Sequence, residues 1–240
     1  MNIKAALKYR LYDTKKSIII FYSVIITLLI FMSAASFFGL NGSANGIEIT
    51  TAFFLFVLGL NSFKEVFRLF MQNGVSRKTT HVSQILITLI ICSIMSLIDN
   101  ILSLIDKSIL TYSNVMSYRG LFQMIYGKDI SNVGTFLTSI LFCFCLYAVS
   151  LSLGYFITTL YYRMNKGQKI AVSISVPALL YIVLPILDYV FFKNNLFRAI
   201  GKFFVFVFSS PLSGMLLCLV LTVILTYISW LLIKKAVIKD

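Results

Sequence analysis

Residues Asn61–Thr80 read NSFKEVFRLFMQNGVSRKTT, a charged stretch that separates two long apolar runs of the chain. Its apolar residues recur at intervals of three and four, which places them on one face of a helix; they are Phe63, Val66, Phe67, Phe70 and Met71. The opposite face carries the polar residues Lys64, Glu65, Arg68 and Gln72. The pattern predicts a short amphipathic helix between two uniformly apolar segments.

The next residues predict where this helix ends and where another begins. Asn73 and Gly74 both tolerate the left-handed backbone conformation that closes a helix. Ser76 is a favourable N-cap for the next helix, and Arg77 and Lys78 come directly after it. In a membrane protein, a helix and turn of this kind would lie at the cytoplasmic surface, within reach of a soluble partner.

The composition of the chain is that of a membrane protein. Of the 240 residues, 59% are hydrophobic and 12% are charged, with a mean hydropathy of +0.94, whereas soluble domains carry about 25% charged residues. A bilayer crossing needs roughly 20 mostly apolar residues. We therefore expect one all-α integral membrane domain over residues 1–240, with six spans at about 17–40, 47–66, 81–105, 134–161, 170–192 and 212–233.

The net charge of +13 follows this topology and does not point to nucleic acid. If both termini are cytoplasmic, 15 of the 21 Lys and Arg residues fall in inner segments, which is the positive-inside bias of membrane proteins. The remaining basic residues fall in outer segments: Lys107, Arg119, Lys128, Lys193, Arg198 and Lys202. The sequence thus predicts a multi-pass protein of the cell (plasma) membrane with both termini in the cytoplasm.

Two segments outside the spans carry amphipathic patterns. Residues 1–16 place Ile3, Leu7 and Leu11 four apart, with lysines off that line, which predicts an elbow helix lying in the inner interface. Residues 193–208 are too short to cross the membrane twice and predict an outer interfacial helix or a shallow re-entrant hairpin between the fifth and sixth spans.

The fifth span contains Pro177 and Pro185. Each proline removes a backbone hydrogen bond, so this helix is predicted to be kinked or broken. The outer segment 106–133 is the longest between spans, and we expect one amphipathic turn within it, formed by Leu121, Phe122, Ile125 and Tyr126.

The chain lacks the motifs of an enzyme or a nucleotide-binding protein. It contains no G-x-x-x-x-G-K-[ST], no G-x-G-x-x-G and no H-E-x-x-H sequence. His81 is the only histidine, and the four cysteines lie in apolar spans, where we expect buried free thiols. We expect no catalytic residue, no metal site and no cofactor held by this chain.

Polar residues within the spans are candidates for a substrate pathway, because charges in a bilayer are costly and often functional. Asn61, Glu65, Asp99, Asn100 and Asp188 are the candidates, and an acidic outer vestibule around Asp99 and Asp188 would suit a cationic or amphipathic substrate. Ordinary placement near helix ends, where headgroup water reaches the side chains, is the alternative for Asp99 and Asp188, and also for Glu48.

Residues 67–79, with the pattern F-x-x-F-M-Q-N-G-V-S-R-K-T, resemble the cytoplasmic coupling segment of permease subunits of the type-two ABC exporter family. In that family a Gly-Val/Ile-Ser-Arg-Lys run typically follows the second span. The layout is also similar: a basic elbow helix, six spans, and an irregular outer segment between the fifth and sixth. The chain looks most like small bacterial permeases that export antimicrobial peptides, lantibiotics or amphipathic toxins such as phenol-soluble modulins.

The resemblance implies a division of labour between chains. A separate ABC ATPase subunit would bind ATP and Mg²⁺, so this chain would be no enzyme. A second permease copy or paralogue would complete the pathway for an amphipathic peptide, drug or lipid-like substrate. The ATPase would dock on Phe67, Phe70, Met71, Gln72, Asn73, Gly74, Val75, Ser76, Arg77 and Lys78.

Two other functions fit the same spans. An ATP-independent secondary carrier or channel would place acidic residues near the bilayer midplane and would have matching broken helices in its two halves. A non-transporting membrane immunity or sensor protein would keep the spans and lack a pathway. In either case Arg77 and Lys78 would be ordinary positive-inside anchors.

Overall fold

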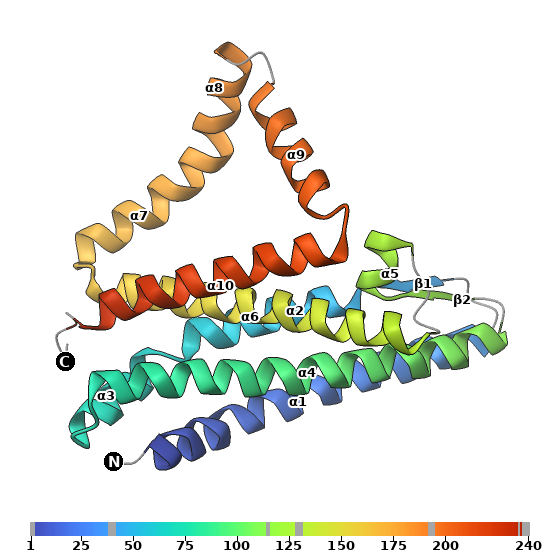
Figure 1. Cartoon of the computed structure of the whole chain (residues 1–240), viewed down its shortest axis with the longest axis horizontal. Helices are drawn as coiled ribbons and strands as arrows, with labels where there is room; N and C mark the ends of the chain where they lie inside the picture. The colour runs from blue at the N-terminus through green and yellow to red at the C-terminus, as the bar shows by residue number, and fades with distance from the viewer. Residues whose placement is uncertain are drawn as a thin grey trace.

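The computed structural model describes residues 3–37, 42–113, 116–127, 132–191, 195–234 and 236. Helices make up nearly all of the described chain (Figure 1). In chain order the elements are α1 (Ile3–Phe37), β1 (Gly42–Asn45), α2 (Ile47–Asn61), α3 (Lys64–Gln72), α4 (Arg77–Ser113), β2 (Met116–Arg119), α5 (Leu121–Tyr126), α6 (Val133–Arg163), α7 (Lys166–Ala178), η1 (Leu179–Val183), α8 (Leu184–Val190), α9 (Asn195–Val207) and α10 (Pro211–Lys234).

Six helical segments of the described chain are long and apolar enough to cross a membrane, in agreement with the six spans expected from the sequence. They are Ile3–Ala34, Ile47–Gln72, Arg77–Ile105, Val133–Arg163, Lys166–Val190 and Pro211–Lys234. This architecture is that of a multi-pass membrane protein.

The bundle has two distinct ends. α1 begins and α10 finishes at one end, where α3 and the link between α6 and α7 also lie (Figure 1). The strands β1 and β2 and the short helix α5 lie at the opposite end. We call these the α3 end and the β end. The segments predicted to be cytoplasmic therefore share the α3 end, as an even number of spans requires.

The N-terminal segment is not a separate helix. α1 runs without interruption from Ile3 to Phe37, about 50 Å at 1.5 Å per residue, so the predicted elbow is not confirmed. The segment contains no glycine or proline that could bend it. Ala6 and Arg10 are its buried residues within the bundle, whereas Ile3 is 41% exposed.

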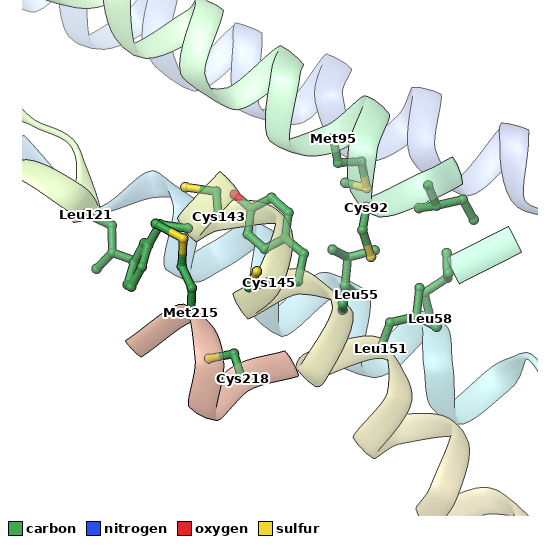
Figure 2. Packing of buried hydrophobic residues seen from close by; sticks show 14 of the residues in the cluster. Leu55, Leu58, Cys92, Met95, Leu121, Cys143, Cys145, Leu151, Met215 and Cys218 are labelled. Atoms are coloured by element: carbon green, nitrogen blue, oxygen red, sulfur yellow. The ribbon is translucent and has the colours of Figure 1, made fainter. Parts of the chain in front are cut away.

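α2, α4, α6 and α10 enclose the main core. Leu55 of α2, Leu151 of α6 and Cys92 and Met95 of α4 belong to one buried cluster, and Figure 2 shows them facing one another. Met215 and Cys218 extend the cluster to α10. All four cysteines are buried free thiols, as predicted.

α2 and α6 cross with their backbones almost in contact at Gly59 and Gly154. A Cβ atom on Gly59 would lie 2.3 Å from the carbonyl oxygen of Leu151, and one on Gly154 would lie 2.2 Å from that of Phe56. Small residues at a crossing allow this close approach in membrane helices. Thr158 strengthens the contact by donating its hydroxyl to the carbonyl of Leu60 at 2.6 Å.

The β end contains the two strands of the described chain. β1 pairs in parallel with β2, and Gly46 N–H extends the pairing by donating to Arg119 O at 3.0 Å. The all-α expectation needs this small correction, because two loops that meet at a helix end satisfy their backbone groups by pairing. α5 provides the predicted amphipathic turn, with Leu121 and Phe122 buried in the main core.

α7, η1, α8 and α9 project away from the other helices and meet in a V (Figure 1). Every side chain of α7 and η1 lies outside the core, and Asp188 is the buried residue of α8. The helix is not broken at its prolines; the five π-helical residues of η1 lie between Pro177 and Pro185 and include Tyr181, the i−4 residue to which Pro185 cannot donate a hydrogen bond. α9 occupies the segment predicted as an interfacial helix or a re-entrant hairpin.

Candidate functional site

α3 lies across the α3 end with its apolar face turned into the bundle. Phe63 and Phe67 stack with their ring centroids 5.0 Å apart, and both pack edge-on against Tyr162 of α6. Tyr155 and Ile233 complete this cluster from α6 and α10. The amphipathic pattern of the sequence therefore predicted the buried face correctly, and that face joins α3 to two spanning helices.

A second cluster lies under the C-terminal half of α3. Val66, Phe70 and Val75 are buried together with Ala6 of α1, and Tyr9 of α1 packs edge-on against Phe70 at 5.9 Å. α3 is thus held between the start of α1 on one side and α6 and α10 on the other.

The end of α3 is a complete Schellman turn. Val75 N–H donates to Phe70 O at 2.9 Å and Gly74 N–H donates to Met71 O at 3.1 Å, which is the bond pattern of that motif. Gly74 has a φ of 69°, a conformation that costs other L-residues roughly 1–2 kcal/mol. The buried contact of Val75 with Phe70 is the apolar contact that accompanies the motif.

Ser76 caps α4 as the sequence predicted. Its Oγ accepts a hydrogen bond from Thr79 N–H at 3.1 Å, which satisfies one of the free donors at the start of the helix. α3 and α4 are therefore joined by a short turn with a hydrogen-bonded cap on each side.

The structure divides the ten predicted coupling residues into two groups. Phe67, Phe70 and Val75 are buried, and Met71 is half-buried; they hold α3 in place. The exposed ones are Gln72, Asn73, Gly74, Ser76, Arg77 and Lys78. The polar face of α3 adds further exposed side chains next to them: Lys64, Glu65 and Arg68.

Arg77 also has a role within the chain. Its Nη1 donates to the carbonyl of Lys234 at 2.6 Å. That carbonyl is one of the free acceptors at the C-terminal end of α10, so Arg77 ties the start of α4 to the end of α10.

Arg10 of α1 is part of this site and was not singled out in the sequence. It is only 3% exposed, and its guanidinium lies 5.5 Å from the ring centroid of Phe70, a cation–π distance. Nη1 donates to Oε1 of Gln84 on α4. Arg10 therefore links α1, α3 and α4 at one point.

The guanidinium of Arg10 is incompletely bonded among the described residues. Its Nε and Nη2 atoms are buried without a partner at hydrogen-bond geometry, as is Nε2 of Gln84. The hydroxyl of Tyr155 on α6 is close enough to interact electrostatically with the guanidinium. Both residues line a cavity of about 20 Å³, which is large enough for one water molecule. No pattern within α1 singles out Arg10, because its burial depends on the packing of α1 against α3 and α4.

Asn61 and Glu65 lie together on a polar cavity beside α3. The cavity has a volume of about 430 Å³ and is also lined by Asp13 and Ser17 of α1. Two of the predicted pathway residues thus face one space, between α1 and the junction of α2 with α3, and two carboxylates line it.

Asp99 and Asn100 lie elsewhere, inside the bundle. Tyr22 donates its hydroxyl to Asp99 Oδ1 at 2.9 Å, and Tyr147 donates to Asp99 Oδ2. Asn100 accepts from Ser139 Oγ at 2.6 Å. These bonds connect α4 to α1 and α6, and both residues are buried.

Glu48 and Asp188 bind the backbones of short helices at their N-termini. Glu48 Oε2 accepts from Leu121 N–H at 3.1 Å, while Asp188 accepts from Leu196 N–H at 2.9 Å and from Phe197 N–H at 3.1 Å. Both carboxylates are buried. They act as helix caps, and Asp188 shares no hydrogen-bonded cluster with Asp99 in the described chain.

Within the described ranges, no group of three or more His, Cys, Asp and Glu side chains could hold a metal ion. The described site is a helix with an exposed polar face and an apolar face packed against α1, α6 and α10. No family model, no curated protein and no solved structure matches the chain.

Proposed function

We propose that this chain is the membrane permease subunit of an ATP-driven exporter of the ABC type. A separate ATPase subunit supplies the energy, binding ATP and Mg²⁺, and docks at the α3 end. A second copy of the permease, or a paralogue, completes the pathway for an amphipathic peptide, drug or lipid-like substrate.

The observation that supports this proposal best is the construction of α3. A segment that only joined two spans would need a turn of a few residues, whereas this chain uses nine helical residues with a cap on each side of the following turn. The apolar face of α3 is buried and the polar face is exposed. That is the arrangement expected of a helix that transmits force from a partner to the membrane.

The contacts of α3 supply routes for that force. Phe63 and Phe67 press on α6 and α10 through Tyr162 and Ile233. Phe70 touches α1 through Arg10 and Tyr9. A tilt of α3 would therefore change the positions of α1, α6 and α10 together, because packed side chains do not deform independently.

The cavity at Asn61 and Glu65 is the best-placed pathway segment in the described chain. It lies directly beside α3 and opens between α1 and α2, so movement of α3 would change its width. The carboxylates of Glu65 and Asp13 would attract a cationic substrate.

A charge-reversal pair on α3 tests the docking role. Lys64→Glu with Arg68→Glu changes two exposed side chains on the polar face of α3, and the matched control is Lys8→Glu with Lys166→Glu, exposed residues at the same end but outside α3. Each permease is co-expressed with an ABC ATPase of its source organism, and co-purification and substrate-stimulated ATP hydrolysis are measured. We expect the α3 pair to weaken association at least about tenfold, or about 1.4 kcal/mol, and the control to retain it.

If the α3 double variant and the control double variant associate equally well with the ATPase, α3 is not the docking surface. Transport into vesicles that is driven by a proton or sodium gradient without ATP would instead favour a secondary carrier. A tightly packed bundle that transports no substrate would favour an immunity or sensor protein.

A further inference from the structure

A third cavity at the α3 end lies on the outside of the bundle, between α4 and α10. Its volume is about 380 Å³, and its floor is apolar, formed by Val82 and Ile85 of α4 and Val223 of α10. Figure 1 shows the start of α4 and the end of α10 at this same end of the bundle. We call this cavity the α4–α10 groove.

The rim of the groove is aromatic and basic. Trp230 and His81 lie across it with their ring centroids 5.2 Å apart, and Tyr227 and Lys78 line it as well. Tyr and Trp are enriched where membrane proteins meet the headgroup layer, so this rim is placed at the height of the inner headgroups.

Charge distinguishes the groove from an ordinary lipid-facing surface. None of the residues that line it is acidic. Lys78 is exposed, and Arg77 and Lys234 lie beside it, joined by the bond between Arg77 Nη1 and Lys234 O. The groove therefore combines a long apolar floor with a cluster of positive charge at one end only.

We propose that the α4–α10 groove binds an anionic phospholipid of the inner leaflet. One acyl chain lies along Val82, Ile85 and Val223, and the headgroup phosphate lies beside Lys78. Basic residues at the cytoplasmic surface attract anionic lipids by about fivefold each in affinity, whereas a zwitterionic headgroup gains little from them. A soluble anion has no acyl chain to pack against the apolar floor, and a lipid without net charge would not be attracted to the basic residues at the rim.

The groove lies on α4 and α10 and not on α3, so the lipid proposal does not require the ATPase. Because Lys78 is also one of the residues expected to face the ATPase, the test below uses this chain without the ATPase. A bound lipid would bridge the two helices that Arg77 joins and so would brace the α3 end. The proposal can therefore hold even if the chain is not a permease.

The chain carries its own reporter for the test, because Trp230 is its single tryptophan. The full-length protein is reconstituted into phosphatidylcholine vesicles containing increasing fractions of lipid with brominated acyl chains, either phosphatidylglycerol or phosphatidylcholine. Bromine quenches only nearby indoles. We expect brominated phosphatidylglycerol to reach half-maximal quenching of Trp230 at about fivefold lower mole fraction than brominated phosphatidylcholine.

Three variants locate the effect. Lys78→Gln should remove most of the preference for phosphatidylglycerol, while Lys64→Gln, an exposed lysine on α3, should preserve it. Val223→Phe fills the floor without changing charge and should reduce quenching by both brominated lipids. Equal quenching by the two lipids in the unaltered protein, or an unchanged preference in Lys78→Gln, would overturn the proposal.

A measurement on the unaltered protein covers the case in which a variant fails to fold. Salt screens the attraction between an exposed lysine and a headgroup, with a Debye length of about 10 Å at 0.1 M and about 3 Å at 1 M. The preference for phosphatidylglycerol should therefore shrink as sodium chloride is raised. A preference that persists in 1 M salt would refute the role given to Lys78.

Discussion

At the scale of single residues, Arg10 is the position where charge and burial conflict. Its guanidinium is buried against Phe70 and bonded to Gln84, yet two of its nitrogens lack a partner in the described chain. A buried charge is costly unless it is fully bonded. A residue of this kind adds little to stability, and its position between α1, α3 and α4 suits a mechanical role.

Substitution of Arg10 and Gln84 tests this account. Gln84→Leu alone leaves the guanidinium with less bonding and should lower the free energy of unfolding by about 1–3 kcal/mol. Arg10→Met together with Gln84→Leu removes both partners and should be at least as stable as the unaltered protein. Thermal unfolding in detergent measures both. A double variant less stable than Gln84→Leu would show that Arg10 contributes net stability.

At the scale of elements, the packing of α2 against α6 depends on two glycines. Gly59 and Gly154 bring the two backbones together, and Leu55 and Leu151 fill the adjacent core, as Figure 2 shows. α3 continues directly from α2, so this crossing fixes where α3 lies. The crossing of α2 with α6, which lies outside α3 itself, therefore determines where the candidate site lies.

Gly154→Ala should separate α2 from α6. Its Cβ atom would meet Phe56 O at 2.2 Å and Leu60 N at 2.9 Å, and overpacking of this kind costs about 1–3 kcal/mol or more. Gly134→Ala lies in the first turn of the same helix with nothing within 4 Å of its Cβ position, so this variant should be as stable as the unaltered protein or slightly more stable. Equal melting temperatures for the two variants would contradict the close crossing.

At the scale of the whole molecule, the V of α7, α8 and α9 makes little contact with the rest of the described chain: Tyr161 of α6 and Ser173 of α7 share a hydrogen bond at 3.1 Å, and Val207 is the buried residue of α9. Within α8, Asp188 is buried because it caps α9. The side chains of α7 and η1 are exposed. Under the permease proposal, a second copy of the chain would cover this surface. The two copies would be related by a two-fold axis, and each would pack its V against the V of the other.

Cysteine scanning in native membranes checks this pairing. All four native cysteines are buried, so an introduced thiol on the V reports alone. Ile174→Cys, Tyr181→Cys and Tyr189→Cys replace exposed side chains of α7, η1 and α8, and we expect at least one to form a disulfide-linked dimer under mild oxidation, because residues near a two-fold axis meet their own copies. Ile20→Cys, exposed on α1, is the control. Equal cross-linking at every position would indicate random collision.

Local chemistry explains what the sequence alone determined about this protein. The six spans, the buried face of α3, the turn at Gly74 and the Ser76 cap each depend on residues within a few positions of one another. The spacing of apolar residues, the turn-forming residues and the capping residues encode such features directly. The exposed polar residues from Gln72 to Lys78 could be identified in the same way.

Tertiary structure decided every feature that joins distant parts of the chain. The burial of Arg10 depends on Gln84, 74 residues away, and Glu48 caps a helix 73 residues further along. Asp99 gained partners on α1 and α6, so it became part of the bundle and not of an open vestibule. No local pattern specifies these contacts, because a side chain's partner depends on which helices pack together in the folded bundle.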